Sequence, residues 1–344
     1  MGSRRTTSRD QPPGLPSPRG EVSRRVITAL GSPALLAHAH EAAEVTDPYG
    51  EDLQLALYVL YELHYQGFRG VDDEREWDPP LLALRGTLER RFLDALRADA
   101  PPGADAEQTL SDLLIEPVGH DDTSVSHHLQ RDGELWQFRE YAALRSLYHL
   151  KEADPHAWVI PRLYGRAKAA MAAIEYDEFG AGRPDEIHAQ LFAELMQDLD
   201  LETAYGHYLD ATPAPALATV NLMSLFGLHR ALRGALVGHF ATVEVTSSPG
   251  SRRLATALRR LGAGAAAQRF YDEHVEADAV HEQVVRRDVI GGLLDAEPHL
   301  DADVAFGVRA TGYLEDRLAK LLLTSWRQGR TALRLPLPAA AHAA

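Results

Sequence analysis

The sequence predicts an all-α protein built around one large helical domain. Apolar residues recur at helical spacing over most of the chain, strand-like alternation is scarce, and Pro, Gly or Asp stands at most junctions between the periodic segments. Hydrophobic residues make up 45% of the 344 residues, which is enough for a globular protein to bury a substantial core. We therefore expect helices packed on helices.

The N-terminal part is expected to hold a tail followed by a helical extension. Residues 1–25 are rich in Arg, Ser, Pro and Gly and offer little to bury, so we predict a disordered tail there. Apolar clusters over residues 53–61 and 81–96 predict paired amphipathic helices within an extension at residues 26–130. Residues 101–132 have a composition typical of a loop, which places the end of the extension near residue 130.

The main domain is expected at residues 131–330, and a flexible C-terminal tail at residues 331–344 should follow it. Junction residues divide the domain into successive helices. The predicted helices span residues 134–152, 157–176, 185–199, 214–228, 229–245, 249–261, 264–285 and 302–327.

Composition limits the possible ligands and partners. Lys and Arg total 35 against 50 Asp and Glu, a formal net charge of −15, so we expect no nucleic-acid partner. The sequence contains no cysteine, so a metal would have to bind nitrogen and oxygen atoms, and 16 histidines provide the nitrogens. Uninterrupted apolar runs of about 18 residues are absent, so we expect no membrane association and a cytoplasmic protein.

The sharpest motif is His274-x3-Asp278-x2-His281, which lies in a run without Gly or Pro. At about 100° per residue, the three side chains share a stripe of about 60° on one helix face. Two imidazoles and a carboxylate on a rigid helix can converge on iron, manganese or zinc. The alternative is a solvated acidic face, since Glu273 and Glu276 lie in the same run.

Two further segments hold candidate ligands. Glu244 follows a segment of core-like residues, and its alternative role is that of a helix end reaching solvent. Glu178 and His188 flank a Gly-rich bend, where glycines allow bulky groups to approach closely. For these two the alternative is a loop followed by a helix with His188 in its first turn.

A third segment precedes the bend. Asp154 is expected to cap a helix that begins near Pro155, and His156 is expected at the surface. Glu152 is the residue in this segment that could reach a metal as an additional carboxylate.

Taken together, these segments resemble the haem-oxygenase-like diiron oxidase and oxygenase superfamily. Its ligand pattern is a Glu and a His on one core helix, a Glu on a second, and His-x3-Asp-x2-His on a third. The resemblance covers about residues 134–326 and implies a haem-oxygenase-like helical bundle. It assigns the ligands to Glu178, His188, Glu244, His274, Asp278 and His281, with Glu152 as an additional candidate.

The interval between the first two ligands indicates a branch of that superfamily. Nine residues separate Glu178 from His188, as in its N-oxygenating branch, whereas much of the family has six. Members of this branch also use an extra carboxylate, for which Glu152 is the candidate. This spacing favours oxygen transfer to nitrogen over the other reactions that the resemblance allows.

The implied function is that of a non-haem diiron enzyme with two Fe(II) ions as cofactor and O2 as co-substrate. The resemblance implies N-oxygenation of an amine, or oxidative cleavage or desaturation of an amino-acid-like or fatty-acid-like substrate in specialised metabolism. We expect a small-molecule substrate and a homodimer, and the chemistry leaves room for an external reductant.

Two alternatives stay open at this stage. One is a metal-free enzyme of the same helical fold, of the thiaminase-like or cofactorless oxidase type. The other is a non-catalytic helical scaffold whose histidines lie at the surface. For the substrate pocket the sequence offers only guesses, which are Tyr205, Tyr208, Phe226, His229 and Arg233.

Overall fold

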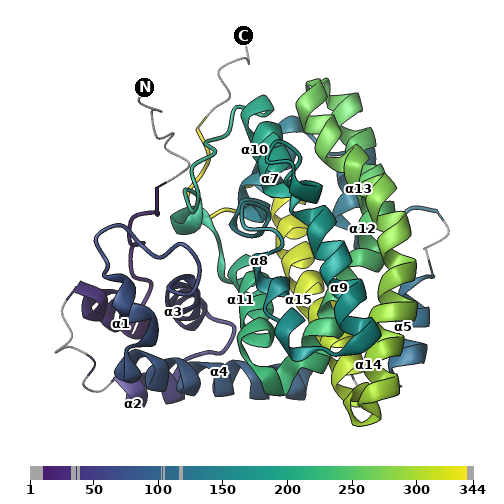
Figure 1. Cartoon of the computed structure of the whole chain (residues 1–344). Coiled ribbons are helices and arrows are strands. Elements are labelled where there is room, and N and C mark those ends of the chain that lie inside the picture. The colour runs from purple at the N-terminus through teal and green to yellow at the C-terminus, as the bar shows by residue number, and fades with distance from the viewer. Residues whose placement is uncertain are drawn as a thin grey trace, which may run out of the picture.

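In the computed structural model the described residues form helices connected by turns and contain no strand, which confirms the predicted all-α class (Figure 1). None of the described helices combines the length and the apolar character needed to cross a membrane. The structure describes residues 11–31, 36, 39–101, 103, 105–115 and 119–338.

The N-terminal helices form a group at one side of the molecule, drawn in purple and blue in Figure 1. Helix α3 is buried along its whole length except its first turn, because Leu, Ala, Val and Tyr residues cover most of its faces. The group consists of α1 (Glu21–Gly31), α2 (Ala39–Val45), α3 (Glu51–Glu62) and α4 (Pro79–Asp99).

The larger part of the chain is a bundle in which α12 is central and packs along both α13 and α15 (Figure 1). Its long helices are α7 (Leu135–His149), α9 (Gly165–Glu178), α10 (His188–Asp198), α11 (Ala214–Leu228), α12 (Arg233–Leu261), α13 (Ala265–Val284) and α15 (Asp301–Arg327). Shorter elements are α5 (Ala106–Leu113), α6 (Val125–Arg131), α8 (Asp154–Ala157), the π-helix η8 (Val285–Ile290) and α14 (Gly291–Ala296).

Two apolar clusters form the core. The larger joins the N-terminal helices to the bundle, since it contains Leu57 and Phe92 together with Phe226 and Phe240. The second cluster joins α7, α10, α13 and α15 through aromatic residues such as Phe192. Because burial of apolar area is the main favourable term in folding, the shared cluster fixes the N-terminal helices against the bundle.

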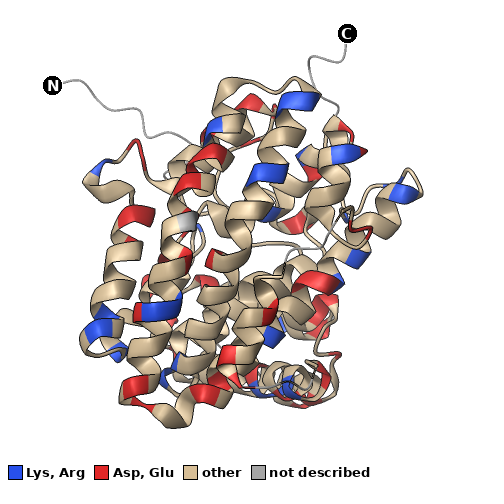
Figure 2. Cartoon of the chain, turned by 90° about the vertical axis from the view of Figure 1, so that its right-hand side faces the viewer, with Lys and Arg blue, Asp and Glu red and all other residues tan. Residues whose placement is uncertain are grey.

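Charged side chains are distributed over the exterior. Figure 2 shows acidic and basic segments interspersed over the side of the molecule formed by the bundle helices. Acidic and basic residues thus alternate over several elements on this side.

The structure differs from the sequence prediction at Pro249. Helices expected at 229–245 and 249–261 are one continuous helix, α12, with this proline inside it. A proline inside a helix costs about 3 kcal/mol because it removes one hydrogen bond and crowds the preceding turn. Beyond it, α12 buries Leu254 and Leu258, and this apolar burial offsets the cost.

The loop expected at residues 101–132 is also partly helical, since α5 and α6 lie within it. These helices have 8 and 7 residues, so each spans only about two turns and its periodic pattern is short. Their starts are stabilised by side-chain caps: Asp105 accepts a hydrogen bond from the backbone of Gln108, and Ser124 accepts one from His127.

The two expected tails are ordered where the structure describes them. Residues 1–10 and 339–344 lie outside the described residues. Arg19 donates to Glu51 and to the carbonyl oxygen of Leu209, and α1 begins at Glu21. At the other end, Leu333 is buried. A partly exposed ion pair and hydrogen bonds to backbone carbonyl groups thus hold a segment whose composition offers little apolar surface.

Candidate metal centre

The predicted three-residue stripe lies on the buried face of α13. His274, Asp278 and His281 are each less than 7% exposed, whereas Glu273 and Glu276 lie on the exposed face of the same helix. The helix therefore has both an acidic solvated face and an interior stripe, and the two candidate histidines are on the interior one. Interior imidazoles and carboxylates need hydrogen-bond partners, a group of opposite charge or a metal.

Glu244 comes from the middle of α12, which packs against α13. It is buried, so the alternative role of a helix end reaching solvent is excluded. Its Oε2 atom lies 3.3 Å from His281 Nδ1. The same nitrogen lies 3.6 Å from Glu178 Oε1 and 3.7 Å from Asp278 Oδ1. Three carboxylates therefore surround one imidazole nitrogen.

The Gly-rich bend brings Glu178 and His188 together. Helix α9 ends at Glu178, α10 begins at His188, and the two buried side chains lie with Glu178 Oε2 2.6 Å from His188 Nδ1. Gly180 permits the bend: its φ is +75°, and a Cβ atom there would lie 2.7 Å from the backbone nitrogen of Ile187. Any other residue would push the two helix ends apart.

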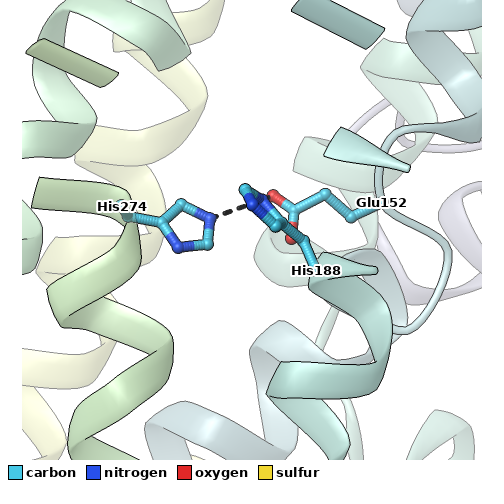
Figure 3. Close-up of side chains that lie close together, drawn as sticks. All are labelled: Glu152, His188 and His274. Atoms are coloured by element: carbon cyan, nitrogen blue, oxygen red, sulfur yellow. Dashed lines mark ion pairs between the residues drawn. The ribbon is translucent and has the colours of Figure 1, made fainter. Parts of the chain in front are cut away.

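Glu152 lies in the turn that follows α7 and is buried. Its Oε1 atom lies 4.0 Å from His274 Nε2, and its Oε2 atom lies 2.9 Å from His149 Nδ1. Figure 3 shows Glu152, His188 and His274 directed toward one another from the turn, α10 and α13. Burial opposes ionisation of Glu152, but His149 and His274 outweigh it and lower its pKa well below the usual value.

Six of the seven predicted ligand side chains form two groups of three that lie side by side. One group is Glu152, His188 and His274, and the other is Glu178, Asp278 and His281. Within each group the potential ligand atoms lie within 4.8 Å of one another, and Glu244 adjoins the second group. Glu178 contacts histidines of both groups, so the two lie side by side.

Several atoms in these groups have no aligned hydrogen bond within the described part of the chain. They are His188 Nδ1, Glu244 Oε2, His274 Nε2, Asp278 Oδ2 and His281 Nδ1. Buried polar atoms are nearly always paired in native proteins, so five exceptions in one place require an explanation. Each of the five atoms can ligate a divalent cation, and a set of nitrogen and oxygen donors suits iron. The residues therefore fit an iron site.

The electrostatics also favour a bound cation. Burial, followed by the charge of Asp278, raises the pKa of Glu244 to about 8 despite the nearby His281. Burial opposes protonation of the two imidazoles, but the carboxylates outweigh it and raise the pKa of His274 to about 10 and that of His281 to about 9. Protons are thus retained where negative charge is in excess, and a cation could replace them.

Three residues that contact this centre or interact with it electrostatically were not singled out from the sequence. His149 holds Glu152, and Asp177 Oδ2 lies 3.4 Å from His281 Nε2. Glu175 is buried without a hydrogen-bond partner in the described chain, and burial raises its pKa to about 9. His149 and Glu175 each lie three residues before a candidate ligand on a helical segment, a spacing that could have indicated them.

Two cavities adjoin the candidate ligands. The smaller is lined by Glu152, Glu178, Glu244, His274 and Asp278. The larger has a volume of about 400 Å³ and lies among α7, α11, α12 and α15. The two cavities share three wall residues, Tyr148, Val243 and Ser247.

The larger cavity contains charged and polar groups as well as leucines. Arg145 donates to both oxygens of Glu315 at 2.8 and 2.6 Å in its wall. Thr311 donates to the carbonyl oxygen of Gly307, so its hydroxyl oxygen accepts from His239 Nδ1 at 2.9 Å. This leaves His239 Nε2 as an acceptor, and burial lowers the pKa of His239 to about 4, which keeps the ring neutral.

Some expectations about neighbouring residues are wrong. His156 is 1% exposed and lines the smaller cavity, so it is not at the surface, and Asp154 lies inside α8 after the cap position, which is Ala153. Three of the residues suggested for the pocket are engaged elsewhere. Tyr205 donates to Glu62, Arg233 donates to Glu297, and His229 lies 3.0 Å from Glu89.

Comparison with known proteins yields one family match. A family model described as an iron-containing redox enzyme matches residues 139–316, which is slightly more than half of the chain. The matched region runs from α7 into α15 and includes all seven candidate ligands. Among curated proteins no sequence matches the chain.

Proposed function

The chain belongs to the family of iron-containing redox enzymes, with a haem-oxygenase-like fold, and we propose that it is a non-haem diiron enzyme that oxidises a small organic substrate with O2. The proposal rests on the convergence of seven buried ionisable side chains. Six of them form two adjoining groups of three, and Glu244 lies beside these groups. Two adjoining groups support two ions better than one, because each group offers at least three ligand atoms.

In this proposal each group holds one iron. Glu152, His188 and His274 bind the first ion, and Glu178, Asp278 and His281 bind the second. Four ionised carboxylates, including Glu244, would balance the charge of two ferrous ions. When bound, the irons supply electrons and Lewis-acid activation for O2.

Other residues would orient the ligands and manage protons. His149 orients Glu152, while the backbone carbonyl oxygen of Phe270 lies 2.7 Å from His274 Nδ1 and leaves Nε2 directed at the centre. Glu175 would keep a proton on its carboxyl at neutral pH, next to the centre. Such supporting contacts fix ligand orientation and tune the site.

The larger cavity is the proposed substrate site because it shares walls with the cavity at the ligands. Its Arg145–Glu315 pair and the acceptor atom His239 Nε2 suit a small polar molecule with an N–H or O–H group better than a plain alkyl chain. We therefore favour N-oxygenation of an amine. One oxygen atom would join the nitrogen and the other would leave as water, with two electrons and two protons from an external reductant.

The proposal is tested by mixing Fe(II)-loaded protein with O2 in a stopped-flow spectrometer. We expect rapid oxygen consumption with a transient visible absorption band, and we expect both to be lost in His281→Ala. The matched control is His299→Ala, since His299 is exposed and distant in sequence from the ligands. A metal-free enzyme or a scaffold would give no iron-dependent signal, and its iron content would be the same in both variants.

A further inference from the structure

A buried ion pair lies directly beside the turn that carries Glu152. Lys151 Nζ donates to Glu62 Oε2 at 3.0 Å, and neither side chain is more than 1% exposed. The partners are 89 residues apart in sequence: Glu62 is the last residue of α3, whereas Lys151 immediately precedes Glu152. The contact therefore connects the N-terminal helices to the turn of a candidate ligand.

The ion pair is enclosed by aromatic residues, and each of its two charged groups has a further partner. Lys151 Nζ lies 5.1 Å from the ring centre of Tyr58 and 4.1 Å from that of Tyr65, distances typical of cation–π contacts. The Tyr205 hydroxyl donates to the Glu62 carboxylate, 2.9 and 3.0 Å from its two oxygens. Three members of this enclosure, Tyr58, Glu62 and Tyr65, belong to α3 and the turn after it.

The turn itself presents neighbouring side chains to different partners. The backbone N–H of Lys151 donates to Tyr148, and the N–H of Asp154 donates to Lys151, so the turn is closed on both sides of Glu152. Lys151 contacts α3, whereas Glu152 contacts His149 and lies near His274. A displacement of the lysine would therefore move the backbone of the adjacent glutamate.

Stability alone is a weak reason for a buried ion pair, because well-packed apolar residues of the same volume stabilise the folded state as much or more. A buried ion pair instead fixes the orientation of its two side chains, because a charged pair with satisfied hydrogen bonds has one favourable geometry. We propose that Glu62 is a positioning residue for the iron held by Glu152, His188 and His274, and that it acts through Lys151. The inference rests on the proposed function, in which Glu152 is an iron ligand.

The test is an anaerobic Fe(II) titration of the wild type, Glu62→Gln and the control Glu51→Gln. Glu51 lies at the opposite end of α3, pairs with Arg19 and accepts from the backbone of Ala214, so the control removes an ion pair from the same helix far from the turn. We expect two equivalents in the wild type and in the control. In Glu62→Gln one equivalent should keep its Kd and the other should weaken at least tenfold.

Near-infrared circular dichroism identifies which iron is affected, since it separates Fe(II) sites by their coordination. Unchanged binding of both equivalents in Glu62→Gln would overturn the inference, and so would equal weakening of both, because a purely structural role predicts no selectivity. Wild-type protein that binds no iron would instead overturn the proposed function and the inference with it.

If Glu62→Gln does not fold, Tyr205→Phe replaces it. This variant removes only the hydroxyl that donates to Glu62 and keeps the ring. We expect the same equivalent to weaken by about threefold, and identical titration curves for Tyr205→Phe and wild type would overturn the inference.

Discussion

Two buried polar clusters lie on opposite sides of one turn, and they differ in how well their charges are paired. In the cluster of Glu62 and Lys151, opposite charges are in contact and the carboxylate also accepts from Tyr205. In the candidate metal centre, the candidate ligands include four carboxylates against three histidines, and five of their atoms have no aligned hydrogen bond within the described residues. The charges of the first cluster are paired as folded, whereas those of the second would be paired by the cation of the proposed function.

This difference predicts opposite effects of removing a charge. The largest effect is expected for Glu62→Gln, which leaves Lys151 buried without its counter-ion. Removing one partner of a buried pair costs about 3–5 kcal/mol, so the free energy of unfolding in urea should fall by about that amount. A decrease below about 1 kcal/mol would mean that the pair is solvated and the comparison is wrong.

Cation binding should stabilise the centre by the next largest amount. A ligand that binds only the folded state at 100 times its Kd adds about 2.7 kcal/mol to the free energy of unfolding. We expect anaerobic Fe(II) to raise the melting temperature of the wild type, and Asp278→Asn to lose most of that increase. An equal increase in the two proteins would place the bound iron elsewhere.

The third prediction concerns pH and the metal-free protein. Burial raises the pKa of Glu175 to about 9, from an ordinary value of 4.5, so the folded state binds an extra proton between these values. The stability that this proton provides is present at low pH and is lost as the pH rises toward 9.

The measurement compares urea unfolding of metal-free wild type and Glu175→Gln at pH 6 and pH 8. The wild type should lose more stability than the variant over this interval, because the amide has no proton to release. Equal losses would indicate that Glu175 is ionised in the folded protein, in contrast to its buried environment.

The smallest effect is expected for Asp177→Asn. Asp177 lies 3.4 Å from His281 Nε2 but is half-exposed, so solvent weakens its influence. Residues that orient a metal ligand typically contribute 10-fold to 100-fold to affinity, and we expect about the lower limit for the Fe(II) held by His281. Unchanged affinity in an anaerobic titration would show that Asn orients the imidazole equally well.

The sequence predicted the parts of the centre that depend on local geometry. His274, Asp278 and His281 follow from helical periodicity alone, and their burial agrees with an interior stripe. Glu244 required the family resemblance, because nothing in its own segment distinguishes an interior carboxylate from a helix end near solvent. The break expected before Pro249 was wrong, since tertiary burial beyond the proline outweighed its local preference.

Contacts between distant segments were beyond sequence reasoning. The Lys151–Glu62 pair joins residues 89 positions apart, and no pattern in the sequence links the two segments. His156 illustrates the same limit: it was expected at the surface, but packing against the rings of Tyr148 and His239 buries it. Composition and spacing cannot specify which faces meet.

The most direct test is anomalous X-ray scattering at the iron edge from crystals grown anaerobically with Fe(II). We predict two iron peaks per chain, one in contact with Glu152, His188 and His274 and one in contact with Glu178, Asp278 and His281. A single peak, or iron bound away from these six side chains, would contradict a dinuclear centre.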